Sequence, residues 1–290
     1  MKLDVFGIVG AALHFVAANF VSVFRIGWLP VAVFLAVDGL TRKIAMATSS
    51  SVLPFELGYV TTLEDTVYVG TFWWANLIFI LVSATIMIAY LRTIIERENR
   101  GDALAYFWFG HAELRYVAAS VILLGVSAVV VVAAYLARAA QLVPWETGFY
   151  AFFVLLAALV WVWLRLSLQS AVILRERGLG FIRAWALLRG NTFRLALALA
   201  IAVVPVWVLG MYGYLAVPGP DWPPLPEWQG DTIQNWPRKW FEWYFQVIER
   251  MEAYPVEMSA IDFTTKILEY ALTAGVIGKA YVQLTATDGR

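Results

Sequence analysis

Residues 165–194 read RLSLQSAVILRERGLGFIRAWALLRGNTFR, and the rest of the chain is organised around this stretch. It leaves one apolar segment, passes through a basic amphipathic elbow and enters the next apolar segment. Arg165 lies in an otherwise apolar run, where a charge inside a bilayer is costly and needs a partner or a route to water. The stretch therefore predicts two membrane spans joined by an interfacial turn.

The composition indicates an integral membrane protein. Hydrophobic residues make up 61% of the chain, charged residues only 14%, and the mean hydropathy is +0.72; a soluble domain carries nearly twice that charge. The zero net charge gives no electrostatic basis for nucleic-acid binding. Because the chain has no cysteine and only two histidines, His14 and His111, we expect no metal site, no disulfide and no cofactor.

The hydropathy pattern predicts an all-α polytopic membrane protein, with residues 1–290 forming one membrane domain of six transmembrane helices and several interfacial amphipathic helices. Each predicted span is close to the roughly 20 residues that a bilayer requires. The predicted spans are about 28–46, 72–91, 117–137, 149–173, 193–215 and 259–281. Residues 4–25 carry a polar stripe from Asp4 to Arg25 and are interpreted as a helix lying in the interface. Residues 218–255, rich in Trp and Pro, are expected to form an outer segment with a surface helix.

The distribution of basic residues predicts the orientation. With both termini in the cytoplasm, the inner face carries thirteen of the 21 Lys and Arg residues and the outer face six, which satisfies the positive-inside rule. Arg42 and Lys43 go against this bias. We therefore expect a multi-pass protein of a bacterial inner (cytoplasmic) membrane.

Three segments share an order of interfacial elbow, outward span, outer loop and inward span. They begin near Asp4, Asp102 and Gly178, and the last two share residues at a spacing of 80, such as Gly110 and Gly190. All three hairpins enter from the same side, which predicts parallel hairpin repeats. The alternative is that six-span proteins often look periodic without being repeats.

The elbow also carries a resemblance to a known family. The residues concerned are Arg165-x-Ser167, Ala171, Glu176-x-Gly178 and Ala184-Trp185-x-Leu187-x-Arg189-Gly190-Asn191. This pattern resembles a bacterial membrane-domain superfamily, related to the membrane domain of some glycerophosphoryl diester phosphodiesterases and to stand-alone relatives that are largely uncharacterised. The resemblance covers 30 residues and implies a six-span layout. No segment matches the phosphodiesterase barrel, so the resemblance implies no hydrolase residues.

Charged residues inside the predicted spans form the first candidate site. This intramembrane polar cluster comprises Asp38, Arg165, Asp262, Lys266 and Glu269. Three of its members, on the sixth span, fall at i, i+4 and i+7 and so share one helix face. The cluster either lines a pocket for a polar substrate or lipid headgroup, or consists of structural pairs that hold the helices together. We expect Arg165 to pair with Glu269 or Asp38.

Basic residues of the elbow form the second candidate site. These lipid-headgroup candidates are Arg175, Arg177, Arg183, Arg189 and Arg194, accompanied by Phe181 and Trp185. Such juxtamembrane clusters attract anionic lipids, although positive-inside bias alone also places arginines here.

The sequence thus predicts a non-enzymatic membrane-embedded accessory or interaction protein. Its expected partners are membrane lipids and a protein bound at the outer segment 218–255. The alternative is a transporter of lipid or a small polar molecule that uses the intramembrane polar cluster. No Gly-x-Ser-x-Gly or His-Glu-x-x-His motif is present, which disfavours an enzyme without excluding one.

Overall fold

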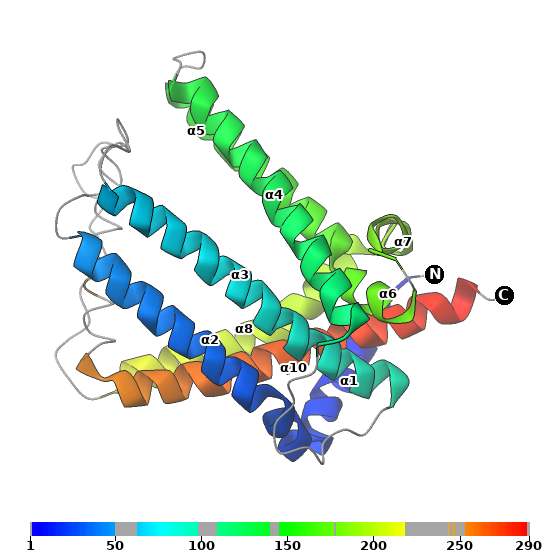
Figure 1. Ribbon diagram of the computed structural model, residues 1–290. Coiled ribbons are helices and arrows are strands. Elements are labelled where there is room, and N and C mark those ends of the chain that lie inside the picture. Colours follow the sequence, from blue (N-terminus) through cyan, green and yellow to red (C-terminus); the bar gives the residue numbers. More distant parts are fainter. Residues whose placement is uncertain are drawn as a thin grey trace. The chain divides into compact units, whose positions relative to one another are not determined.

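The computed structural model describes residues 2–49, 63–97, 109–139, 145–176, 178–217, 243, 246 and 253–288. Every regular element in these ranges is helical (Figure 1), which confirms the predicted all-α class. Most of the outer segment 218–255 lies outside the described residues, as does Arg177.

Among the described residues, five helical stretches are long and apolar enough to cross a membrane, so the chain is a multi-pass membrane protein. They are Phe20–Thr41, Trp74–Glu96, His111–Val130, Phe153–Arg175 and Thr192–Ala216. The sixth predicted span lies in α10 (Pro255–Asp288). This helix is not among the five, because Asp262, Lys266, Glu269 and several small polar residues lower its hydropathy. The six-span count, the orientation and the repeats stay predictions.

The N-terminal helix is shorter than predicted. Instead of one helix over 4–25, the structure has α1 (Val5–Ala18), a turn at Asn19 and then α2 (Phe20–Ser49). Asp4 begins α1 as an N-cap, because its Oδ1 accepts the Gly7 N–H at 3.1 Å. At the other end, the Asn19 side chain and main chain both donate to the Phe15 carbonyl and end the helix.

Helices α3 (Leu63–Leu91) and α4 (His111–Ala139) are longer than the spans expected at 72–91 and 117–137. The chain of α3 continues into a π-helical turn, η1 (Arg92–Glu96), which ends at Arg97 in a left-handed conformation with φ 54°. Single π-helical turns are rare in proteins, and those that occur are often found at functional sites.

The fourth predicted span, 149–173, is broken in the structure. It consists of α5 (Trp145–Leu166) and α6 (Gln169–Arg175), separated by a turn at residues 167–168. The short helix α7 (Phe181–Leu187) and the span α8 (Thr192–Ala216) follow. Arg165 therefore lies in the last turn of α5 and not inside a continuous span.

The chain divides into two compact units, each made of parts of several helices. Unit 1 comprises Met1–Pro30, Ile80–Val204 and Ile267–Arg290, and unit 2 comprises Val31–Phe79 and Pro205–Lys266. Two of the divisions fall beside Pro30 in α2 and Pro205 in α8. Proline lacks the N–H that a helix interior needs, so both helices are locally weakened where the units divide.

The core of unit 1 is built around the C-terminal half of α10, which contacts α1 and the end of α3. Gly275 allows α10 to approach α1, because a Cβ there would lie 2.8 Å from the Ala12 Cβ. Gly278 does the same toward η1, where a Cβ would lie 2.8 Å from the Ile94 Cγ2. Small residues are the usual means of close helix packing in membranes.

Candidate functional site

Residues 165–194, called the elbow below, are shaped by local hydrogen bonds. Helix α5 ends because the Ser167 hydroxyl, which donates to the Leu164 carbonyl at 2.7 Å, competes with the helical pattern. The Gln169 side chain donates to the Leu179 carbonyl at 2.8 Å and folds the loop after α6. Gly180 (φ 73°) and Gly190 (φ 78°) adopt left-handed conformations on either side of α7, which favour glycine.

Arg165 contacts aromatic rings and a backbone carbonyl. Its Nη1 donates to the Trp185 carbonyl at 3.2 Å, and its guanidinium carbon lies 4.6 Å from the Trp185 ring centroid and 5.7 Å from that of Trp161. Trp161 in turn packs against Phe193, with ring centroids 5.1 Å apart. These residues belong to α5, α7 and α8, so Arg165 lies where three helices of unit 1 meet.

Glu269, the acidic partner expected for Arg165 within unit 1, is not among the contacts of Arg165 in the part of the chain that the structure describes. The expected pairing with Asp38, which belongs to unit 2, stays a prediction. None of the contacts that Arg165 makes among the described residues is with a carboxylate, and its Nε is buried without a hydrogen-bond partner. The reason is the break after Leu166, which places Arg165 at a helix end. There a cation is stabilised by the partial negative charge of the last turn without an acid.

Three other arginines bind backbone carbonyl groups. Arg115 donates to the carbonyls of Ile173 (3.4 Å) and Glu176 (3.0 Å) at the end of α6. Arg175 donates to the Ile95 carbonyl at 3.0 Å, and Arg194 donates to the Leu3 carbonyl at 2.9 Å. The last carbonyls of a helix have no intrahelical partner, so Arg115 and Arg175 satisfy groups left open at the ends of α6 and η1. The Leu3 carbonyl bound by Arg194 precedes α1.

The N-terminus is fixed to the same region. The Leu3 N–H donates to the Asn191 side chain at 2.9 Å, and the Asp4 N–H donates to Gln283 near the end of α10 at 3.4 Å. Figure 1 shows the start of the chain and the end of α10 beside α6 and α7, which all belong to unit 1.

The lipid-headgroup candidates thus differ in what they contact. Arg175 and Arg194 use part of their donors on carbonyls, and Arg183 pairs with Glu176 at 3.4 Å, where both side chains are 43% exposed. Arg189 is exposed and has no polar contact within the described ranges.

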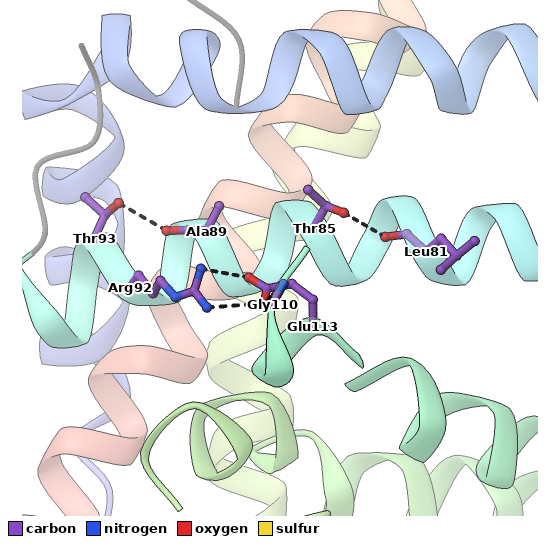
Figure 2. A network of polar contacts seen from close by, with 7 residues as sticks. All are labelled: Leu81, Thr85, Ala89, Arg92, Thr93, Gly110 and Glu113. Atoms are coloured by element: carbon purple, nitrogen blue, oxygen red, sulfur yellow. Dashed lines mark hydrogen bonds and ion pairs between the residues drawn. The ribbon is translucent and has the colours of Figure 1, made fainter. Parts of the chain in front are cut away.

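A buried ion pair was not predicted from the sequence. Glu113 is fully buried, and its Oε1 lies 2.8 Å from Nη1 of Arg92, whose side chain is 13% exposed. The second carboxylate oxygen accepts from Arg92 Nη2 at 3.2 Å and from the Gly110 N–H at 3.0 Å (Figure 2). Glu113 is the third residue of α4 and accepts the N-cap N–H, as in one half of a capping box. A Glu three residues after a glycine, at the start of an apolar helix, was the available signal.

The intramembrane polar cluster is divided between the two units. Asp38, Asp262 and Lys266 belong to unit 2, whereas Arg165 and Glu269 belong to unit 1. All five side chains are half-buried.

The α10 members of this cluster lie next to other helices of their own unit. Asp262 accepts a hydrogen bond from the Tyr214 hydroxyl of α8, and the Lys266 ammonium lies 5.8 Å from the Phe34 ring centroid of α2. In unit 1, Tyr270, which follows Glu269, is hydrogen-bonded to Ser83 of α3 at 2.6 Å. These contacts are of the kind that holds helices together in a membrane.

An apolar groove of about 410 Å³ lies between α4 and α5. Its lining residues are Ser127, Leu156, Leu159, Val160, Trp163 and Leu164. A groove formed by residues from two helices depends on their packing and cannot be recognised in either segment alone. With one hydroxyl in its lining, it offers little for a polar ligand.

No protein-family model, no curated protein and no solved structure matches this chain. The resemblance of residues 165–194 to the phosphodiesterase-associated membrane domains therefore stays a prediction.

Proposed function

We propose that this multi-pass protein is a non-enzymatic accessory protein of a bacterial inner membrane, which contacts anionic lipids through the elbow. The observation that carries the proposal is the exposed face of the elbow. Ile182 is 89% exposed and Phe193 76% exposed, and the cationic side chains of Arg183 and Arg189 are exposed beside them in sequence. Apolar side chains together with arginines, placed where a span ends, suit the boundary between headgroups and acyl chains.

A protein partner at the outer segment 218–255 remains part of this proposal. Its support is the sequence of that segment, in which tryptophans and prolines are concentrated. Aromatic residues are enriched at interfaces between proteins. Purification of the tagged protein in mild detergent should recover a stoichiometric partner, and deletion of 219–235 should remove it.

A transporter is the second candidate, and the half-buried polar side chains of α10 favour it. Its test uses Lys266→Met and Glu269→Gln in proteoliposomes. An accessory protein should tolerate both substitutions without a change in flux of lipid or small polar solutes. A transporter should lose flux, because an intramembrane charge that binds substrate has no apolar substitute.

The lipid proposal is tested with the wild-type protein in nanodiscs. Thermal unfolding should be compared in phosphatidylcholine alone and in mixtures with phosphatidylglycerol. A ligand that binds only the folded state raises the unfolding temperature as its concentration rises. We therefore expect the midpoint to rise with the phosphatidylglycerol fraction and the rise to shrink in high salt. An unfolding midpoint that is independent of lipid charge would refute the proposal.

A further inference from the structure

We propose that Arg165 binds the phosphate group of an anionic membrane phospholipid, in a site framed by Trp161, Trp185 and Phe193. This inference rests on the proposed lipid-contacting function and names the residue that recognises the headgroup. All four residues belong to unit 1. Arg165 contacts the rings of Trp161 and Trp185, and Trp161 packs against Phe193.

The first argument is the unused binding capacity of the guanidinium. A guanidinium has five N–H donors, and among the described residues that of Arg165 has one hydrogen bond, to the Trp185 carbonyl. Its other contacts are with ring faces, which attract the positive charge but accept no conventional hydrogen bond. The planar fork of an arginine matches a phosphate group, which accepts two parallel hydrogen bonds.

The second argument is the contrast with nearby arginines that have polar partners. Arg115, Arg175 and Arg194 each donate to carbonyl groups at a chain or helix end. Arg183 has a carboxylate partner in Glu176. Arg189, an elbow arginine without a polar contact in the described ranges, is exposed, whereas Arg165 is half-buried. Arg165, in the last turn of α5, has neither an acid of unit 1 nor a second carbonyl as a partner within the described ranges, so its guanidinium keeps unused donors for an external anion.

The third argument identifies a lipid as the source of that anion. The Phe193 ring, which packs against Trp161, is 76% exposed, and Trp185 is 39% exposed. Tryptophan is enriched at the headgroup level of a membrane, where Trp161 and Trp185 would lie here. A phospholipid supplies the phosphate for Arg165 and the acyl chain that covers these rings, whereas a soluble phosphate supplies only the first.

The experiment is a competition between lipids for the full-length protein. Wild-type protein is equilibrated in detergent with equal amounts of phosphatidylglycerol and phosphatidylcholine, and the bound lipids are counted by native mass spectrometry. Arg165→Leu should reduce the bound ratio of the two lipids about fivefold, the effect of one basic residue at an anionic surface. Arg165→Lys keeps the positive charge but loses the planar guanidinium, so its lipid ratio should lie between those of the wild type and Arg165→Leu. Lys43→Ala, which removes an exposed charge of α2, is the matched control and should leave the ratio unchanged.

The outcomes separate this inference from the proposed function. A wild-type protein without any preference for phosphatidylglycerol would refute both. If Arg165→Leu keeps the wild-type preference for phosphatidylglycerol, the Arg165 site alone is refuted. If Lys43→Ala loses as much of that preference as Arg165→Leu, the effect is one of general charge, and the Arg165 site is refuted as well. Competition by inorganic phosphate at the concentration of the lipid would overturn the choice of a lipid.

Folding is monitored through the unfolding transition of each variant. If Arg165→Leu does not fold, Arg165→Lys decides the question, because a ratio equal to that of the wild type would refute recognition by the guanidinium fork.

Discussion

The Arg92–Glu113 ion pair provides the sharpest test of the fold of unit 1. Glu113 is fully buried and binds both guanidinium nitrogens of Arg92 and the N-cap N–H of Gly110. Glu113→Gln keeps an acceptor for the Gly110 N–H but removes the carboxylate charge that faces the Arg92 guanidinium. Removing one member of a buried pair costs about 3–5 kcal/mol. The glutamine retains the cap, so we expect a loss near the lower limit, about 3 kcal/mol.

The assay is thermal unfolding in detergent, followed by the fluorescence of the 14 tryptophans. At roughly 2–4 °C per kcal/mol for a domain of this size, Glu113→Gln should lower the midpoint by about 6–12 °C. The matched control is Glu176→Gln, which removes the carboxylate facing Arg183 in a pair whose side chains are 43% exposed. Surface pairs contribute about 0–1 kcal/mol, so this variant should shift the midpoint by at most about 4 °C.

A double substitution separates the pair from the cap. Arg92→Met combined with Glu113→Gln removes both charges and keeps the acceptor for Gly110, so most of the lost stability should return. Equal shifts for Glu113→Gln and Glu176→Gln would refute the buried pair. A double variant less stable than either single variant would refute the argument that losing the carboxylate charge opposite Arg92 causes the loss.

Three further predictions concern packing and topology. Gly275→Ala should lower the unfolding midpoint, because its Cβ would lie 2.8 Å from the Ala12 Cβ and overpacking costs about 1–3 kcal/mol. The control is Gly125→Ala, whose Cβ would meet nothing within 4 Å. It should raise the midpoint, because alanine has a better helix propensity than glycine. Single cysteines at Ser50 and Gln229 should react with an impermeant thiol reagent in spheroplasts, whereas one at Gly180 should not; labelling at Gly180 would invert the topology. A cysteine at His14, exposed on α1, should behave like Gly180, because hydrogen bonds fix Leu3 to Asn191; labelling from outside would place α1 across the membrane.

The long helices were predictable because apolar runs of about 20 residues leave few alternatives to a span. The predicted spans 117–137 and 193–215 lie within α4 and α8, and both helices begin at or before the predicted residue. The errors lie where a helix stops. The breaks at Asn19 and at residues 167–168 fall inside apolar or weakly polar runs, where hydropathy gives no signal.

Other contacts that shape the elbow and the N-terminus come from partners far along the chain. The open carbonyls at the end of α6 are bound by Arg115, 58 and 61 residues away, and the carbonyl of Leu3 is bound by Arg194, 191 residues away. A single sequence shows that an arginine is present but not which carbonyl it meets. The same limit applies to Arg92 and Glu113, each of which looks like an ordinary charged residue at a span end.

The arginine bias of the predicted inner face therefore has a second physical cause beside membrane topology. A span that breaks into an elbow leaves carbonyl groups without helical partners, and arginine can reach and satisfy several of them from one side chain. Arg115 does this at the end of α6 and Arg175 at the end of η1, both in unit 1. Their loss should loosen the elbow whatever the lipid composition, whereas a headgroup-binding arginine should matter only when anionic lipid is present. Structural and headgroup-binding arginines can therefore be told apart by measuring whether the loss of stability in each variant depends on anionic lipid. We expect this dependence for variants of Arg165 and Arg189.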